Sequence, residues 1–366
     1  MSARSKKRSR NESRQSAADY SPSSSPPPTT TAGICTKVSD RYEKIGRVGE
    51  GTYGIVYKAR DTTVTRNNNN GFVALKRCIP HHEASDGFPL TTLREIHALQ
   101  TLQGHPNIIS LQEIAVSSTT GVFLVFDYCP YDLANIIDAY YPKHKKSPFD
   151  ENQVRQLIYQ LTSAIHHVHS HYMLHRDIKL SNLLYSENGT LKLADFGLSR
   201  HISRGADNNK QMTANVVSLW YRAPELLFQT CRDYTSAIDL WAIGITLAEL
   251  LQGCPLWDGK SEEEQCSMIC QGLGGPPPDY LLFGNNHTTT AQPQQRDSKS
   301  KKKQMMLLMD QFDYLPTEAL SFLTNLLRYD PAKRWNAKQA LTSMYLKDCA
   351  SSDGVSRISM PKFPAS

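Results

Sequence analysis

The chain contains the sequence His175-Arg176-Asp177-Ile178-Lys179-Leu180-Ser181-Asn182, and Asp195-Phe196-Gly197 begins thirteen residues after Asn182. These two segments bring together the residue types that phosphoryl transfer requires. They hold a carboxylate that can accept a proton, a lysine that can neutralise phosphate charge, and hard oxygen ligands for Mg²⁺. Residue type, order and spacing all agree, so a chance run of polar loop residues is the weaker interpretation.

The two segments resemble the catalytic loop and the metal-binding turn of the eukaryotic protein kinases. The resemblance implies that Asp177 accepts the proton of the substrate hydroxyl and that Lys179 steadies the transferring phosphate. It also implies that Asn182 and Asp195 supply oxygen ligands to Mg²⁺. A lysine at position 179 favours Ser or Thr over Tyr as the phosphate acceptor.

A glycine-rich segment, Gly49-Glu50-Gly51-Thr52-Tyr53-Gly54, stands nearer the N-terminus. Apolar alternation around Val48 and Val56 predicts a β-hairpin rather than the strand-to-helix turn of a dinucleotide fold. Glycines allow the backbone to approach phosphates closely. In the kinase interpretation this hairpin covers ATP and contributes Val48, Gly49, Glu50, Gly51, Thr52, Tyr53, Gly54 and Val56 to the nucleotide site.

A strand-like run, Val73-Ala74-Leu75-Lys76, follows the hairpin. The resemblance implies that Lys76 holds the α- and β-phosphates of ATP and pairs with Glu95, and that Ala74 lines the adenine pocket. The alternatives are an exposed lysine and an exposed helical glutamate, which the register of the surrounding motifs disfavours.

The segment Pro89-Leu90-Thr91-Thr92-Leu93-Arg94-Glu95 resembles the cyclin-binding helix of the cyclin-dependent kinases. Its amino-acid sequence is most similar to that of the PISSLRE and PITSLRE branches and differs from that of the PSTAIRE branch. Leu93, Ile96 and Leu99 recur at a spacing of three, which predicts one apolar helix face. The resemblance implies that a cyclin binds the Pro89–Glu95 helix.

The segment from Leu124 to Leu133 resembles the connection between the two lobes of a kinase. The resemblance implies five further ATP contacts: Phe126 as gatekeeper, the backbone of Asp127 and Cys129 at adenine, Asp132 at the ribose, and Leu184 as the floor.

An activation segment is expected from Asp195 to Ala223-Pro224-Glu225. Within it, Val216-Val217-Ser218-Leu219-Trp220-Tyr221-Arg222 resembles the segment that forms the pocket for a proline after the phosphoacceptor. Substrates with Ser-Pro or Thr-Pro sites are therefore expected. Ser218 replaces the usual Thr but keeps a hydroxyl that can bond to Asp177 and Lys179.

Three regulatory phosphorylation sites follow from the same resemblance. Phosphate on Thr213 is expected to activate the kinase by binding Arg94, Arg176 and Arg200. Phosphate on Thr52 or Tyr53 is expected to inhibit it, because the added charge lies over the ATP phosphates.

Two structural roles are also expected in the larger lobe. Arg334 is predicted to form a buried ion pair with Glu225. Asp239 opens a nearly apolar helix, the expected core of that lobe, and is predicted to brace the catalytic-loop backbone.

Composition restricts the remaining possibilities. The chain has 366 residues and a net charge of +6, and residues 1–14 hold six basic residues against one acidic residue. Residues 296–303 hold five basic residues against one acidic, so the rest of the chain is acidic and a nucleic-acid-binding surface is not expected. No run of 18 apolar residues occurs, so no membrane association is expected.

The eight cysteines include no Cys-x-x-Cys pair, which favours packing roles in a reducing compartment. Lys6-Lys7-Arg8-Ser9-Arg10 fits a nuclear-import signal as well as a solubilising tail. The expected location is the nucleus, the cytoplasm or both.

The predicted architecture is the bilobal α+β protein-kinase fold, with ATP and Mg²⁺ between the lobes. The expected divisions are a disordered basic, Ser/Pro-rich tail at 1–39, a kinase domain at 40–349 and a C-terminal tail at 350–366. Within the domain, a small β-rich N-lobe is expected at about 40–127 and a larger helical C-lobe at about 130–349, with a low-complexity insertion at about 285–304.

The predicted activity is that of a cyclin-dependent serine/threonine kinase in cell-cycle or transcription control. One alternative is a catalytically weak kinase-fold scaffold that binds a cyclin. Another is a mitogen-activated kinase, although Thr213-Ala214-Asn215 stands where that family has Thr-x-Tyr. A small-molecule phosphotransferase is a third alternative, but it would not need the proline pocket. The sequence does not identify the cyclin or the substrates.

Overall fold

The computed structural model describes residues 36–51, 54–63, 71–78, 89–117, 121–186, 189–202, 217–228, 234–275 and 306–350. The chain divides into two units, residues 1–35 and 36–366, and every described residue belongs to the second. The predictions that concern Thr52, Tyr53, Thr213 and the segments 1–35, 285–304 and 351–366 lie outside the described residues. Within the described ranges, no helix has the length and apolar character needed to cross a membrane.

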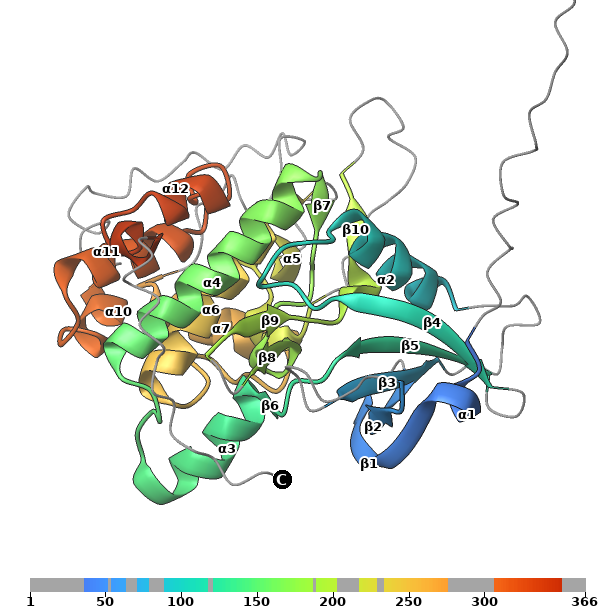
Figure 1. Cartoon of the computed structure of the whole chain (residues 1–366). Coiled ribbons are helices and arrows are strands. Elements are labelled where there is room, and N and C mark those ends of the chain that lie inside the picture. Colours follow the sequence, from blue (N-terminus) through green and yellow to red (C-terminus); the bar gives the residue numbers. More distant parts are fainter. Residues whose placement is uncertain are drawn as a thin grey trace, which may run out of the picture. The chain divides into compact units, whose positions relative to one another are not determined.

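A five-stranded antiparallel sheet forms the first part of the second unit, in the order β1-β2-β3-β5-β4 (Figure 1). The strands are β1 (Tyr42–Gly51), β2 (Gly54–Asp61), β3 (Phe72–Cys78), β4 (Leu111–Ser117) and β5 (Gly121–Asp127), and helix α1 (Val38–Arg41) precedes them. Strands β1 and β2 pair from Tyr42 with Asp61 to Gly51 with Gly54. This pairing confirms the predicted hairpin.

Strand β3 divides its side chains between the two faces of the sheet, because successive strand residues point in opposite directions. Val73 and Leu75 are buried in a small apolar cluster that includes Phe123. Ala74 and Lys76 face the other way and line the cleft described below. The apolar residues of the strand thus anchor it and fix the direction in which Lys76 points.

Helix α2 (Leu90–Thr101) forms where a helix was predicted and packs against β4. Its buried residues are Thr92, Glu95, Ala98 and Leu99. The prediction of one apolar face through Leu93 and Leu99 is wrong, because Leu93 is 48% exposed. At about 100° per residue, positions six apart differ by about 240°, so a strict spacing of three drifts around the helix.

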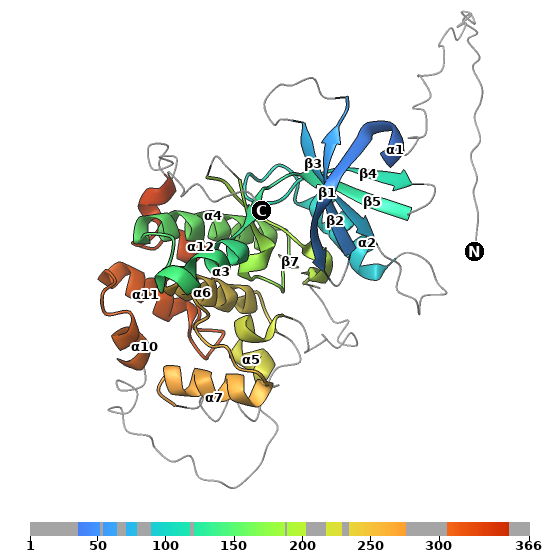
Figure 2. The ribbon, with the colours of Figure 1, turned by 90° about the horizontal axis from the view of Figure 1, so that it is seen from below.

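The second part of the unit is mainly helical (Figure 2). Its helices are α3 (Leu133–His144), α4 (Glu151–Ser170), α5 (Pro224–Leu227), α6 (Ala237–Gln252), α7 (Glu262–Gly272), α10 (Met306–Gln311), α11 (Thr317–Leu326) and α12 (Ala337–Leu341). Every residue of α6 from Ala237 to Leu250 is buried, and the helix packs against α4 and α11. Helix α6 is therefore the core that the apolar sequence predicted.

Local sequence signals determine where several of these helices begin. Asp150 precedes α4; its side chain accepts from the Gln153 backbone N–H, and its own backbone N–H donates to Gln153 Oε1. Asn336 and Gln339 form the same reciprocal capping box at α12. Each box satisfies backbone N–H groups that the first helical turn leaves without partners.

Short strands and turns form in the segments that connect the five-stranded sheet to the helices. Strands β6 (Tyr131–Asp132), β8 (Leu183–Tyr185) and β9 (Leu191–Leu193) form one small sheet, and β7 (Met173–Leu174) pairs with β10 (Arg200–His201). The described residues also form the 3-10 turns η1 (Leu180–Asn182), η2 (Phe196–Leu198), η3 (Leu219–Tyr221) and, after α12, η5 (Lys347–Ala350).

The predicted ion pair between Arg334 and Glu225 is formed and buried. The two side chains lie 2.8 Å apart and are 0% and 3% exposed. Arg334 also donates to the backbone oxygens of Ala237 and Arg328. The pair therefore links α5 and the start of α6 to the segment that leads into α12.

Candidate active site

Lys76, Glu95 and Asp195 meet although they are distant in the sequence. The Lys76 Nζ lies 2.8 Å from both carboxylate oxygens of Glu95 and 3.3 Å from Asp195 Oδ1. Strand β3 presents the lysine, α2 presents Glu95, and Asp195 immediately precedes η2. The pair of Lys76 with Glu95 that the resemblance implied is thus present.

Lys76 stabilises the charge of Asp195, whereas burial and the nearby Asp195 raise the pKa of Glu95. Burial opposes the charge on Lys76, but the carboxylates of Glu95 and Asp195 outweigh burial and raise its pKa. Burial likewise acts to raise the pKa of Asp195, yet Lys76 lowers it overall. At neutral pH the site therefore holds an ammonium beside a carboxylate that remains ionised.

Three side chains surround Asp177: Lys179 and Asn182 of the catalytic loop, and Ser218 of the activation segment. The Lys179 Nζ lies 2.8 Å from Asp177 Oδ2, and Asn182 Nδ2 donates to Asp177 Oδ2 at 3.1 Å. Ser218 donates to Asp177 Oδ1 at 3.2 Å and accepts from Lys179 at 3.2 Å. The hydroxyl of Ser218 thus makes both bonds that were predicted for it.

Asp239 holds the backbone of this loop from the N-terminal turn of α6. Its carboxylate accepts from the backbone N–H groups of His175 and Arg176, each at 3.0 Å, and bonds to His169 Nε2 at 2.8 Å. Arg176 adopts a left-handed conformation with φ of 68°, which non-glycine residues rarely adopt without support. The predicted bracing role of Asp239 agrees with these contacts.

A cleft of about 770 Å³ opens between the sheet and the catalytic loop. Most of the predicted nucleotide contacts line it: Val48, Gly49, Gly54, Val56, Ala74, Lys76, Phe126, Asp127, Cys129, Asp132 and Leu184. The predicted catalytic residues Glu95, Asp177, Lys179, Asn182 and Asp195 also line it. Glu50 and Gly51 end β1, and the predicted contacts of both with the nucleotide lie outside what the structure describes.

Sequence reasoning did not predict several residues of the cleft. Ile109, Tyr128, Asn135, Ile136 and Val217 belong to its lining. Ile109 reaches the cleft because its backbone N–H bonds to the Leu193 carbonyl, far along the chain. No local pattern encodes such a pairing, so only the fold reveals it.

Asp132 has a second role besides lining the cleft. Its carboxylate caps α3 and accepts from the backbone N–H of Asn135 at 2.8 Å and from the Asn135 amide at 2.6 Å. The cap fixes the carboxylate at the mouth of the cleft.

The segment after Val216 has an unusual backbone at Val217, with φ of 76°. A β-branched residue in this region requires outside support. The Val217 carbonyl oxygen accepts from Arg222 Nη2 at 3.1 Å and from Arg222 Nε at 3.4 Å. Arg222 is itself held by an ion pair with Glu262.

The three predicted phosphate-binding arginines lie near one another. Burial lowers the pKa of Arg94, and the charges of Arg176 and Arg200 lower it further. Arg176 also donates to the Leu198 carbonyl at 2.6 Å and to the Tyr234 hydroxyl at 2.5 Å. The cluster connects α2, the catalytic loop and β10.

The donor set fits a magnesium ion. Asn182 uses its Nδ2 on Asp177, which leaves its amide oxygen as the free acceptor, and Asp195 carries an ionised carboxylate. Carboxylate and amide oxygens, completed by water and phosphate oxygens, are ligands that Mg²⁺ prefers. Among the described residues, no group of three or more His, Cys, Asp or Glu side chains is arranged to hold a metal ion without such help.

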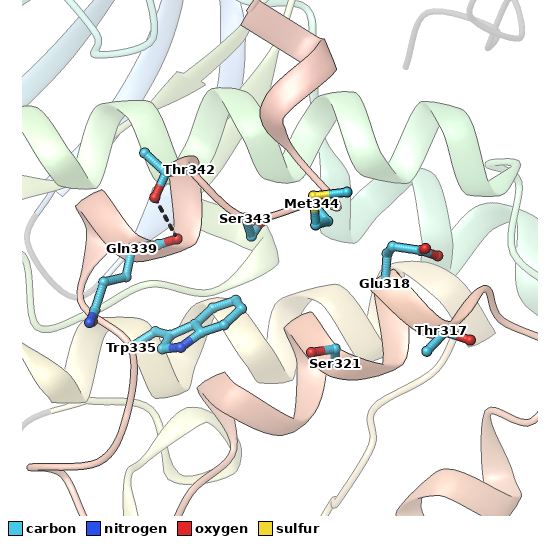
Figure 3. A pocket seen from close by; sticks show the side chains of 8 residues that line it. All are labelled: Thr317, Glu318, Ser321, Trp335, Gln339, Thr342, Ser343 and Met344. Carbon is cyan, nitrogen blue, oxygen red and sulfur yellow. Dashed lines mark hydrogen bonds between the residues drawn. The ribbon is translucent and has the colours of Figure 1, made fainter.

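A second pocket, of about 540 Å³, lies between α11 and α12 (Figure 3). Its lining residues are Thr317, Glu318, Ser321, Trp335, Gln339, Thr342, Ser343 and Met344. The eight described residues include one carboxylate and no basic group. This pocket therefore does not offer the chemistry found in the larger cleft.

Comparison with known proteins first identifies the class. The family described as "Protein kinase domain" matches residues 42–346, which is most of the chain. The fold and the cleft are accordingly those of a protein kinase.

Individual relatives narrow the class. Human cyclin-dependent kinase 10 is 40% identical over 323 residues, which cover 88% of this chain and 84% of the relative. The PITSLRE serine/threonine kinase of Drosophila melanogaster is 38% identical over 86% of this chain and 32% of its own length. A solved structure of the CAK complex from Chaetomium thermophilum, bound to ATP-γ-S, matches with a TM-score of 0.70 and 32% identity, covering 84% of this chain and 92% of that one.

The chain belongs to the cyclin-dependent kinases. It is an ATP-using serine/threonine protein kinase, as the sequence predicted.

Proposed function

We propose that this kinase transfers the γ-phosphoryl group of ATP to a Ser or Thr that precedes a proline, with a cyclin bound against α2. The observation that carries the proposal is the convergence of Lys76, Glu95, Asp195 and Asp177 in one cleft.

The residues of the cleft divide the work of phosphoryl transfer. Asp177 accepts the proton of the substrate hydroxyl, and Lys179 and Asn182 hold its carboxylate by direct bonds. Lys76, oriented by Glu95, binds the α- and β-phosphates of the nucleotide. Mg²⁺, bound by Asn182 and Asp195, would neutralise charge on the phosphates.

The preference for proline follows from the backbone of Val217. Its carbonyl oxygen already accepts two bonds from Arg222, so it cannot also accept an N–H from the residue after the phosphoacceptor. An ordinary residue there would leave its N–H without a partner on desolvation, whereas proline has no N–H to satisfy.

The proposed cyclin surface is the outer face of α2. Leu90 is 60% exposed and Leu93 is 48% exposed, although both are large and apolar. Their exposure on the helix that carries Glu95 supports a partner that covers them and fixes the Lys76–Glu95 pair. The names of the relatives, which include cyclin-dependent kinases, agree with such a partner.

We further propose the three regulatory phosphorylations. The closeness of Arg94, Arg176 and Arg200 supports a phosphate on Thr213, which would bond to all three and join α2 to the catalytic loop. A phosphate on Thr52 or Tyr53 would repel ATP. The basic run at residues 6–10 supports a nuclear pool beside a cytoplasmic one, which a fluorescent fusion lacking that run would test.

The substrate preference can be tested with three peptides that differ only after the serine. They carry proline, alanine or N-methylalanine, and the last residue lacks an N–H but has no ring. We expect kcat/KM to be similar for proline and N-methylalanine and about 5- to 100-fold lower for alanine, since an unsatisfied N–H costs about 1–3 kcal/mol. Equal turnover of all three peptides by the cyclin-bound enzyme would refute the proposed role of Val217.

The catalytic assignment can be tested with Asp177→Asn and Asp195→Asn. Each should lower kcat by orders of magnitude while thermal unfolding stays close to that of the wild type. The exposed Asp310→Asn provides a matched control. Near-normal peptide phosphorylation by either variant would exclude the proposed mechanism.

A further inference from the structure

A pair of histidines joins α2 to the beginning of the activation segment. The Nε2 atoms of His97 on α2 and His201 on β10 lie 3.2 Å apart, which is hydrogen-bond distance. Their ring centroids are 5.3 Å apart with an angle of 52° between the rings. Figure 1 shows β10 beside α2. The turn η2 precedes β10 in the sequence.

His97 lies on a different side of α2 from Glu95. The two residues are two positions apart, so their side chains leave the helix about 200° from one another. Glu95 reaches Lys76 on the sheet, and His97 reaches β10. Helix α2 is therefore held from two sides, and both contacts are made in the same arrangement of the helix.

Strand β10 is itself anchored to the catalytic part of the molecule. His201 pairs with Met173 and Arg200 pairs with Leu174 of β7, directly before His175. The contact between His97 and His201 thus connects the helix that orients Lys76 to the strand that enters the catalytic loop.

We propose that His97 and His201 are positioning residues, whose shared hydrogen bond holds α2 where Glu95 reaches Lys76 and is lost when both rings are protonated. The inference rests on the proposed role of the Lys76–Glu95 pair. Neither histidine lines the cleft.

The dependence on protonation follows from the chemistry of imidazole. A bond between two Nε2 atoms needs one N–H donor and one bare nitrogen, so at least one ring must be neutral. One proton on the pair strengthens the bond, because the donor becomes charged. A second proton removes the acceptor and places two cations at 3.2 Å.

Basic residues lie beside both histidines in the sequence. Arg94 lies one turn before His97 on α2, Arg200 adjoins His201 on β10, and Arg176 lies near both arginines. The β7 residues that pair with β10, Met173 and Leu174, are apolar and carry no charge. The nearest carboxylate along α2, Glu95, is already paired with Lys76. Burial and the proximity of His97 lower the pKa of His201. The bond therefore persists while at least one ring is neutral and is lost as the pH falls and both rings become protonated.

Variants at the two positions test the coupling. His97→Ala and His201→Ala should each lower kcat/KM at pH 7.5 by about threefold, and the double variant should be no worse than either single one. Fully additive losses, or no loss, would show that the side chains do not act as a pair.

The pH profile separates positioning from packing. The double variant His97→Gln/His201→Gln has amides that can bond to each other at any pH. We expect the activity of the wild type relative to this variant to fall about threefold or more between pH 7.5 and 5.5. His144→Gln, an exposed histidine on α3, is the control and should keep a constant ratio. A constant ratio for the double variant as well would overturn the proposal.

A measurement without catalysis distinguishes this inference from the proposed function. Long-range ¹H–¹⁵N spectra of histidine-labelled full-length protein report the protonation of each Nε2 directly. We expect coupled titration of the two rings, and a shift in the His201 titration when His97 becomes Gln. Independent titration of the two rings would refute the pair, whatever the activity of the enzyme.

Discussion

Glu249 offers a direct test of the energetics of the core helix. Its carboxylate lies on the buried part of α6 and accepts a bond of 2.5 Å from the Tyr221 hydroxyl. Burial raises the pKa of Glu249 from the ordinary 4.5 to about 7. Because the folded-state pKa is the higher one, the folded state binds this proton more tightly. The resulting stabilisation is complete below pH 4.5 and is lost as the pH rises through 7.

The shift in pKa sets the size of the effect. One pKa unit corresponds to about 1.4 kcal/mol, so the whole shift corresponds to about 3 kcal/mol in the free energy of unfolding. Glu249→Gln keeps an oxygen acceptor for Tyr221 but cannot ionise. The wild type should therefore lose about 3 kcal/mol of stability between pH 4 and pH 8.5 through this residue, and the variant should not.

Urea unfolding followed by tryptophan fluorescence at pH 4.0, 5.5, 7.0 and 8.5 measures this difference. Glu318→Gln, an exposed carboxylate on α11, is the matched control and should show little dependence on pH. If the stability curves of Glu249→Gln and the wild type run parallel across this range, Glu249 does not titrate as described and the reasoning fails.

Three further outcomes are expected. Gly244→Ala should lower the free energy of unfolding by about 1–3 kcal/mol in urea titrations, because the added Cβ would lie 2.8 Å from Leu327, whereas Gly46→Ala, with nothing within 4 Å, should be nearly neutral in packing. Glu225→Gln should lower it by about 3–5 kcal/mol in the same assay, because Arg334 keeps a buried charge without a counter-ion. Asp239→Asn should reduce kcat about tenfold or more in peptide assays, because an amide offers one oxygen to the two N–H groups of the catalytic loop.

The sequence predicted those parts of the site that short motifs encode. Lys76, Asp177 and Asp195 each stand in a motif whose residue types and spacing are tied to one chemistry, and the fold brings them together. The contacts of Asp239 and Arg334 were expected from the resemblance to the protein kinases, and the structure contains both.

Other features depend on geometry that no short pattern contains. The left-handed conformation of Val217 exists because Arg222 holds its carbonyl oxygen, and the valine itself gives no sign of it. The spacing of Leu93, Ile96 and Leu99 predicted one apolar face of α2, yet Leu93 is exposed, because the neighbours of the helix decide which side is covered. The contact of His97 with His201 joins residues more than a hundred positions apart.

The attachment of the catalytic loop to α6 implies an order of events on heating. Asp239 belongs to α6, which is buried from Ala237 to Leu250, so Asp177 in the attached loop keeps its surroundings until the core itself melts. Helix α2 is joined to other elements through side chains such as Glu95 and His97 and should loosen earlier. We therefore expect inactivation in two stages: a first loss of activity that cooling reverses, and a second that coincides with the unfolding of the helical part.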